Sequence, residues 1–286
     1  MQTLICQGWK DYELLDSGNG MRLERFGPYI TARPDPQAIW LPSLAPIDWQ
    51  DADVFFKRTS AEKGIWQFKR RIPEKWLMHW KDVSFWTRLT SFKHTGVFPE
   101  QALHWKFIDE TITKSKKEIS VLNLFGYTGI STVVAAAAGA KVTHVDASKP
   151  SIFWAKENLE ASKLSQKPVR WILDDAVKFV EREIRRGSTY DAIIMDPPIY
   201  GHGPTGQIWK FQESFPKLMK LCSQLLSKDP CFMIVNAYAI SASSIMLGNV
   251  LGGYLKTGTL EVGELALEEK TSKRLLSTGI FARWHQ

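Results

Sequence analysis

The chain has 286 residues, 44% of them hydrophobic and 23% charged, and its formal net charge is +7. This length and composition predict one large domain or two modest ones around a sizeable core, and they exclude a disordered chain. The basic excess favours an anionic partner.

The first 105 residues predict a β-rich region. They hold eight of the twelve tryptophans, and "YELLDSGNGMRLERFGPYITARP" (12–34) contains two extended runs joined by the turn-forming "DSGNG". Prolines between positions 28 and 46 break the segment that follows into loops. We expect residues 1–92 to form a smaller N-terminal β-rich domain and residues 93–286 to form the main domain.

From residue 119 onward, strand and helix signals alternate. Strands are predicted at 119–125, 141–146, 169–173, 190–195 and 231–237, and helices at 128–140, 149–164, 174–187, 209–227 and up to about 251. Two extended segments, 258–267 and 275–284, close the chain without a helix between them. The alternation predicts right-handed βαβ units and an α/β, Rossmann-like parallel sheet covered on both faces, with the closing strands paired antiparallel at one edge.

Ligands of such sheets bind beyond the carboxyl ends of the strands, which here carry "FGYTG", "DAS", "DDA" and "DPPIYG". Gly126 and Gly129 permit a close backbone approach, but their loop is not GxGxxG, which argues against a dinucleotide site. Asp146 suits two ribose hydroxyls or else caps the next helix. Asp174 and Asp175 suit an adenine amine, with the same alternative. Acids at three successive strand ends favour a ligand rich in hydroxyl and amine donors but without phosphates, such as S-adenosylmethionine.

The order "NLFGYTG", "VDAS", "DDA", "MDPP" resembles the class I S-adenosylmethionine-dependent methyltransferases. More narrowly, it is similar to the bacterial 23S ribosomal RNA methyltransferase group that includes the C5-cytosine and N7-guanine enzymes. "KHTGVFPEQ" (93–101) matches a K-x-TG-aromatic-xx-Q segment of that group. The resemblance covers roughly 85–286, and in a dedicated subgroup it extends through "LLDSGNGMRLERFG" and "RPDP". It implies a seven-stranded sheet with the final strand inserted antiparallel.

The resemblance also implies cofactor-binding positions. Gly126, Tyr127 and Thr128 would line the methionine moiety, Asp146 the ribose, and Asp175 with Ala176 the adenine, while Thr95, Phe98 and Gln101 would cover the cofactor. The full expected set is Lys93, Thr95, Gly96, Phe98, Gln101, Phe125, Gly126, Tyr127, Thr128, Asp146, Ala147, Ser148, Asp174, Asp175 and Ala176.

The segment "DPPIYG" predicts the catalytic residues Asp196, Pro197, Pro198 and Tyr200. The prolines have no backbone N–H, so their carbonyls and the Asp196 carboxylate are left as acceptors. These acceptors can hold a base amine while Tyr200 stacks on a flipped or unpaired base. The alternative is a strand-terminating turn with Asp196 as a local cap.

One departure from the resemblance concerns the chemistry. The C5-pyrimidine enzymes need a cysteine at the end of the fifth strand, where this chain has Asn236-Ala237-Tyr238. Covalent C5 chemistry is therefore disfavoured, and transfer to a nitrogen or an oxygen is favoured.

Residues 57–93 predict the substrate-recognition surface, with ten Lys and Arg against three Asp and Glu and seven interleaved tryptophans and phenylalanines. Basic side chains follow a phosphate backbone and aromatic rings stack on unpaired bases. Lys69, Arg70 and Arg71 are the densest cluster. The alternative is that the tryptophans form the core of the β-rich region and the lysines its solvated face.

The expected compartment follows from what the sequence lacks. Three widely spaced cysteines predict neither a disulfide framework nor a metal site, and the N-terminus lacks a signal-peptide pattern. Neither long uncharged window, 119–140 or 230–255, is a continuous apolar stretch. We expect a cytoplasmic protein with no metal and no membrane partner, and a homo-oligomer remains open.

The sequence thus predicts a methyltransferase that uses S-adenosylmethionine and acts on RNA, ribosomal RNA first, at a base nitrogen. Methylation of a protein side chain or small molecule is the alternative within the enzyme class. A non-catalytic RNA-binding protein with a vestigial cofactor fold and an NAD enzyme are further alternatives, and the intact strand-end acids argue against the former.

Overall fold

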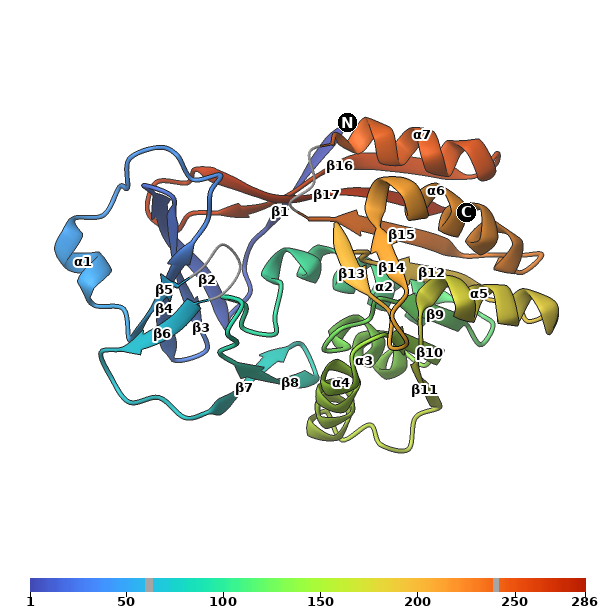
Figure 1. The fold of residues 1–286 in the computed structure, drawn as a ribbon, viewed down its shortest axis with the longest axis horizontal. Coiled ribbons are helices and arrows are strands. Elements are labelled where there is room, and N and C mark those ends of the chain that lie inside the picture. The colour runs from blue at the N-terminus through green and yellow to red at the C-terminus, as the bar shows by residue number, and fades with distance from the viewer. Residues whose placement is uncertain (60–63, 239–241) are drawn as a thin grey trace. The chain divides into compact units, whose positions relative to one another are not determined.

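The computed structural model describes residues 1–59, 64–238 and 242–286, which form two compact units (Figure 1). The first unit comprises Met1–Leu4, Leu103–Leu265 and Thr278–Gln286. The second comprises Ile5–Ala102 and Ala266–Ser277. The expected domains met at one boundary, between residues 92 and 93, whereas each unit is built from more than one segment of the chain.

The first unit is built on a sheet of eight strands. Their order is β1 (Gln2–Cys6), β16 (Thr259–Glu268), β17 (Leu275–His285), β15 (Phe232–Ala237), β12 (Ala192–Met195), β9 (Ser120–Leu124), β10 (Lys141–Asp146) and β11 (Val169–Leu173). The pairs from β15 to β11 are parallel, and β17 runs antiparallel to β15. The predicted α/β fold is confirmed, as is the antiparallel insertion of the final strand, which lies between β15 and β16.

The sheet has one strand more than the seven expected, because β1 adds to its edge beside β16. Strand β1 is short and half-exposed, and "QTLIC" shows no alternation of apolar and polar residues. Gly263 of β16 permits the pairing, since a Cβ there would lie 1.7 Å from the carbonyl oxygen of Gln2. The chain thus closes this edge with a segment that carries no pattern of its own.

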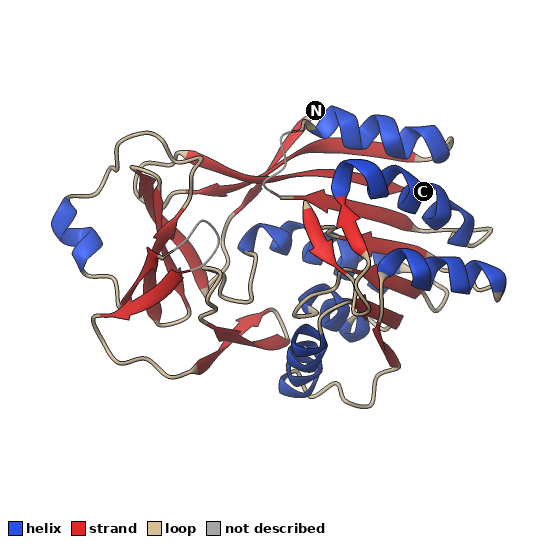
Figure 2. Cartoon of the chain, in the orientation of Figure 1, coloured by secondary structure: helices blue, strands red, loops and turns tan. Residues whose placement is uncertain are grey.

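Helices cover both faces of this sheet (Figure 2). They are α2 (Ala102–Lys114), α3 (Ile130–Ala137), α4 (Lys149–Ala161), α5 (Ala176–Arg185), α6 (Phe211–Leu225) and α7 (Ser244–Tyr254). In β9, Leu122 and Leu124 belong to the core formed with α5, α6 and α7. Between them Asn123 points to the other face and donates to Thr132 of α3 at 2.9 Å. The apolar runs of the central strands follow from this double covering.

A small hairpin separates strand β12 from helix α6. Its strands are β13 (Tyr200–His202) and β14 (Ile208–Lys210). The sequence predicted a helix from residue 209, but α6 begins at Phe211 because Trp209 and Lys210 pair with the strand before them. The signal was present in "GHGPTGQ", whose glycines and proline are typical of a tight turn.

The second unit contains the predicted N-terminal hairpin and adds strands to it. The five-stranded sheet consists of β2 (Tyr12–Gly18), β3 (Met21–Phe26), β4 (Tyr29–Pro34), β5 (Val54–Arg58) and β6 (Gly64–Phe68), and β7 (Lys75–Trp80) pairs with β8 (Val83–Arg88). Strands β2 and β3 turn at Asn19 and Gly20, within the predicted "DSGNG". Part of the expected loop is instead the short helix α1 (Pro46–Gln50), with a proline in its first turn.

Packing at Gly126 predicts a measurable loss of stability. A Cβ on Gly126 would lie 2.3 Å from Cε1 of His144, whose ring is fully buried and 2.9 Å from the hydroxyl of Thr132. Gly126→Ala should lower the free energy of unfolding by about 1–3 kcal/mol, because the ring cannot move aside. Urea denaturation measures this.

The matched control is Gly253→Ala in α7, where a Cβ meets nothing within 4 Å. This variant should be neutral or slightly stabilised. Equal stability of the two variants would contradict the packing argument.

Candidate active site

The loop after β9 is tightly curled. Phe125 and Tyr127 both have left-handed backbone conformations, with φ values of 55° and 49°. The N–H of Gly126 donates to the carbonyl of Val145 in β10 at 3.1 Å. Left-handed residues other than glycine cost energy and persist where the surrounding structure holds them. Here they turn the N–H of Tyr127 toward the end of β10.

Asp146 ends β10, and its carboxylate is oriented by two backbone amides. Tyr127 N–H donates to Oδ2 and Ser148 N–H to Oδ1, each at 2.8 Å. Burial raises the pKa of Asp146, and the two amides oppose this rise. The capping alternative is wrong for Asp146, because the N-cap of α4 is Ser148, which accepts from Ser151 N–H. Each carboxylate oxygen keeps a further lone pair, so the group can accept from two neighbouring hydroxyls.

The acids after β11 have structural partners. Asp175 is the N-cap of α5 and accepts from Lys178 N–H at 2.9 Å, as the capping alternative predicted. Asp174 accepts from Asp175 N–H at 2.8 Å and forms an ion pair with Arg182. Its own N–H donates to the carbonyl of Asp146 at 3.1 Å, which connects the ends of β10 and β11. Ala176 opens α5 and is buried.

The "DPPIYG" segment leaves β12 and leads into the hairpin. Removal from water raises the pKa of the Asp196 carboxyl to about 6. Pro197 is buried and Pro198 is exposed, and the carbonyl of Pro198 accepts from the indole N–H of Trp209 at 2.6 Å. Tyr200 is 54% exposed, with its ring edge-on to His202 at 5.1 Å. The sequence left the Pro198 carbonyl as an acceptor for a ligand, and in the structure one of its two lone pairs accepts from Trp209.

The four loops occupy one edge of the sheet. Their strands lie in the order β12, β9, β10, β11 and are parallel, so the loops follow one another at the carboxyl ends. The acceptor groups of Asp146 and Asp196 therefore lie on either side of the curled loop after β9. No lysine or arginine occurs within "FGYTG", "DAS", "DDA" or "DPPIYG". This chemistry suits a ligand that donates hydrogen bonds and carries no phosphate.

The expected covering residues belong to the second unit. Lys93 donates to the carbonyl of Pro34 at 3.2 Å, and burial followed by the charges of Arg22 and Arg33 lowers its pKa to about 8. The remaining positions are a turn and a short helix: Thr95 and Gly96 are buried, Phe98 lies with its ring 5.2 Å from that of His94, and Gln101 ends the 3₁₀ helix Pro99–Gln101.

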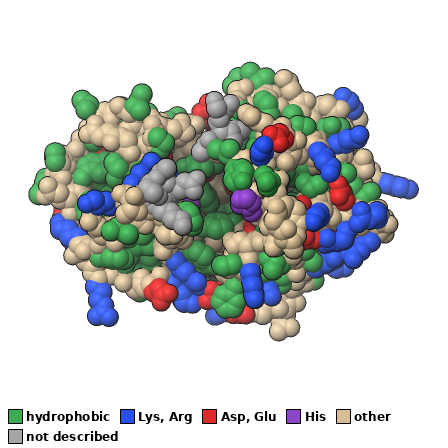
Figure 3. Space-filling model, in the orientation of Figure 1, with side chains coloured by type: hydrophobic (Ala, Val, Ile, Leu, Met, Phe, Trp, Pro, Cys, Tyr) green, Lys and Arg blue, Asp and Glu red, His purple; other side chains and the backbone are tan. Residues whose placement is uncertain are grey.

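The expected substrate cluster is partly neutralised within the same unit. Lys69 lies 3.7 Å from Asp51, and Arg70 lies 3.3 Å from Asp53. Arg71 is exposed. Lysine and arginine side chains also gather over α5 of the first unit (Figure 3). Cationic side chains thus gather in both units, not only at the three residues picked out by sequence.

Several of the aromatic residues expected to meet the substrate are core residues. Trp76, Trp80 and Phe85 are at most 9% exposed, so the alternative of a tryptophan core holds for them. Phe68 and Phe92 are 59% and 47% exposed.

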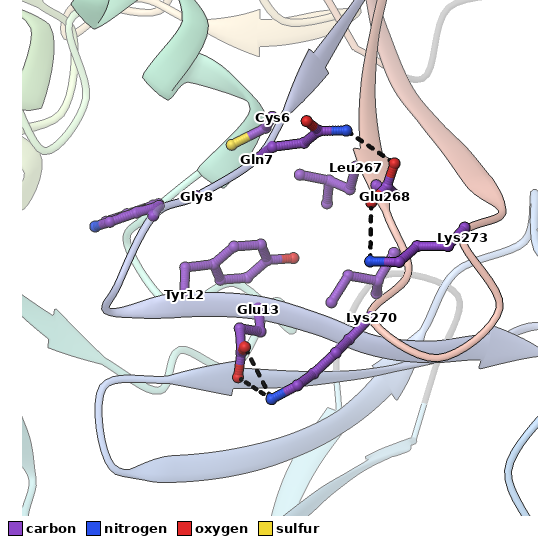
Figure 4. A pocket seen from close by; sticks show the side chains of 11 residues that line it. Cys6, Gln7, Gly8, Tyr12, Glu13, Leu267, Glu268, Lys270 and Lys273 are labelled. Atoms are coloured by element: carbon purple, nitrogen blue, oxygen red, sulfur yellow. Dashed lines mark hydrogen bonds and ion pairs between the residues drawn. The ribbon is translucent and has the colours of Figure 1, made fainter.

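A cavity of about 340 Å³ lies in the second unit, between the strand β2 and the β16–β17 turn (Figure 4). None of the residues predicted from the sequence lines it. Its charged groups pair with one another: Glu13 with Lys270 at 2.9 Å and Glu268 with Lys273 at 3.2 Å.

Within the described part of the chain, no three or more His, Cys, Asp or Glu side chains are grouped so that they could hold a metal ion. No described helix is both long and apolar enough to span a membrane.

Comparison with known proteins gives strong matches. The crystal structure of the SAM-dependent methyltransferase from Agrobacterium tumefaciens is 42% identical, with a TM-score of 0.97 over 100% of this chain and 93% of that one. SMU.776, solved in complex with S-adenosylhomocysteine, shares the fold at 18% identity and a TM-score of 0.75, over 97% of this chain and 76% of its own. No family model matches the sequence.

Two curated relatives are named as RNA enzymes. Ribosomal RNA large subunit methyltransferase K from Neisseria meningitidis is 25% identical over 221 residues, which are 74% of this chain and 61% of that protein. Ribosomal RNA large subunit methyltransferase K/L from Shewanella sp. strain MR-4 is 32% identical over 194 residues, which are 66% of this chain and 26% of that protein. The chain therefore spans about three fifths of the first relative and about a quarter of the second.

The geometry of Asp146 predicts how its loss affects ligand affinity. Asp146→Ala should weaken binding of S-adenosylhomocysteine tenfold or more, about 1–3 kcal/mol for a lost charge-assisted pair. Isothermal titration calorimetry measures this. Glu118→Ala, which loses an acid of the first unit that is paired with Lys141 and lies outside the four loops, is the control. Unchanged affinity of the Asp146 variant would mean that this carboxylate does not contact the ligand.

Proposed function

The chain belongs to the S-adenosylmethionine-dependent methyltransferases, and we propose that it methylates a base nitrogen of ribosomal RNA. The observation that carries the proposal is the Asp196 carboxylate at the end of β12, one strand from the curled loop and four residues before the exposed Tyr200. The two relatives named as ribosomal RNA methyltransferases support RNA as the substrate.

The strand-end residues fit the cofactor chemically. S-adenosylmethionine presents a ribose diol, an adenine amine and an ammonium group, all of them donors, to an edge whose loops offer acceptors. We assign the ribose to Asp146, the adenine to Asp175 with Ala176, and the methionine moiety to the loop residues Gly126, Tyr127 and Thr128. The role of Asp175 as an N-cap uses Oδ1 and is compatible with a contact through its other oxygen.

The remaining expected positions complete the assignment. Phe125, Ala147, Ser148 and Asp174 belong to the same loops of the first unit. Lys93, Thr95, Gly96, Phe98 and Gln101 belong to the second unit, and for them a cofactor contact is only what the family resemblance implies.

The chain's own residues act by holding the acceptor base. The bound cofactor supplies an electrophilic methyl group on a sulfonium that is already a good leaving group. Asp196 accepts an N–H of the base amine and turns its lone pair toward the cofactor side. Pro197 and Pro198 present no competing N–H donor. Tyr200 stacks on the base and keeps water from the amine.

The cysteines argue against C5 chemistry. Strand β15 ends with Asn236 and Ala237, so no cysteine stands where the C5-pyrimidine enzymes carry one. Cys222 is buried within α6 and Cys231 precedes β15. Burial raises the pKa of both thiols, which disfavours the thiolate needed for covalent attack. Direct transfer to nitrogen needs no such nucleophile.

The proposal predicts methyl transfer whose rate falls at acid pH. The wild-type protein should move a labelled methyl group from S-adenosylmethionine to protein-free large-subunit ribosomal RNA. Because Asp196 accepts an N–H only when ionised, and its pKa is raised to about 6, turnover should fall as the pH drops through 6. Asp196→Asn should lose about a hundredfold or more of kcat at pH 8 while S-adenosylhomocysteine affinity stays nearly constant.

Three outcomes count against this proposal. A profile flat down to pH 5 would contradict the role of Asp196, as would loss of cofactor affinity together with activity in Asp196→Asn. Label appearing in proteins or small molecules of the extract, and never in RNA, would favour the alternative substrate classes.

The basic cluster predicts a salt effect on RNA binding. Replacing Lys69, Arg70 and Arg71 by alanine should weaken binding and flatten the slope of log K against log salt by about one to two. Fluorescence anisotropy with an unpaired RNA at several salt concentrations measures this slope. A variant with alanine at Lys114, Lys116 and Lys167, exposed positions of the first unit, loses the same formal charge and is the control. Equal slopes in the two variants would mean that only net charge matters.

A further inference from the structure

The indole of Trp209 lies between two loops of the active site. It belongs to β14, is 4% exposed, and is paired in register with Gly201 of β13. Its ring centroid is 4.9 Å from that of Phe125, the first residue of the curled loop after β9. Its N–H donates to the carbonyl of Pro198 at 2.6 Å. A single side chain therefore contacts the loop assigned to the cofactor and the loop assigned to the substrate.

The bond to Pro198 fixes the base of the hairpin. The peptide after Pro198 leads into β13, and the N–H of Phe211, at the start of α6, donates to the carbonyl of Ile199 at 2.9 Å. The bonds from Trp209 and Phe211 therefore tie two successive carbonyls of the segment that carries Tyr200. The Tyr200 ring itself remains exposed.

The hairpin presents an apolar surface beside the inferred site. Ile199, Tyr200 and Ile208 are 47%, 54% and 60% exposed, while Trp209 between them in the fold is buried. The buried Trp209 anchors this exposed apolar patch. An anchored patch binds a planar partner better than a mobile patch does, because less conformational entropy is lost on binding.

We propose that Trp209 is a positioning residue, which sets the Pro198 carbonyl and the Tyr200 ring relative to the loop after β9 and so aligns the acceptor base for transfer. This inference rests on the proposed function for its activity readout. Its physical basis is the combination of one hydrogen bond and one ring contact, which join the segment after β12 and the loop after β9 through a single side chain.

The test is Trp209→Phe, which keeps an aromatic ring beside Phe125 and removes the N–H. Methyl transfer to RNA should show kcat reduced by about tenfold or more, with the affinity for S-adenosylhomocysteine within about twofold of wild type. Hydrogen–deuterium exchange of the segment 199–210 should accelerate by about tenfold, since the carbonyl that anchors it has lost its donor.

The matched control is Trp284→Phe. Trp284 lies in the same core, is 2% exposed, and its indole N–H likewise donates to a backbone carbonyl, that of Thr257 at 2.5 Å. Trp284 pairs with Met233 near the start of β15, at the edge of the sheet opposite the strand ends that carry the site loops, so this variant should lose stability without losing kcat or loosening the hairpin.

The outcomes separate the inference from the proposed function. An equal fall of kcat in both variants would mean that Trp209 acts only as a core residue. Unchanged hydrogen–deuterium exchange at 199–210 would show that Trp209 does not anchor the hairpin. If the wild-type protein methylates no RNA, the proposed function fails and exchange alone decides: faster exchange confined to the hairpin supports the anchoring role, and unchanged exchange refutes it.

Discussion

The hydrogen bond from Tyr127 N–H to Asp146 is the contact on which the site of the first unit depends. It forms only because the loop after β9 passes directly over β10, and that passage needs a residue without a side chain at position 126, above the ring of His144. The ring is neutral, because burial lowers the pKa of His144 to about 3. The loop thus rests on an uncharged, fixed surface, and its left-handed residues stay turned toward the carboxylate.

Asp146 and Asp196 are the same kind of side chain, and the tasks proposed for them differ. Both lose water on folding and both have raised pKa values. Two backbone amides donate to the carboxylate of Asp146 and oppose the rise of its pKa with burial. The pKa of Asp196 rises to about 6, with removal from water as the cause.

Much of the fold and part of the site could be predicted from sequence, for physical reasons that differ from element to element. Central strands such as "YDAIIM" are buried on both faces and therefore form continuous apolar runs. Strand β1 lies at an edge and has no such run, so only tertiary pairing reveals it. Asp146 and Asp175 look alike in sequence, since each follows a strand and precedes a helix. Only the structure shows that Asp175 is an N-cap and that Asp146 is not. The sequence predicted that Trp209 begins a helix, because strands β13 and β14 of its hairpin have only three residues each and give no recognisable strand pattern.

The order of strands in the large sheet has a consequence for biosynthesis. Strand β17, the last in the chain, lies between β15 and β16, and β1, the first, pairs with β16 more than 250 residues later. While the ribosome is still making residues 275–285, the edge of β15 that will pair with β17 stays unpaired, and the strands already made are largely apolar. Vectorial folding cannot finish this half of the sheet. The nascent chain must keep its central strands from pairing with other chains until residues 275–285 have emerged.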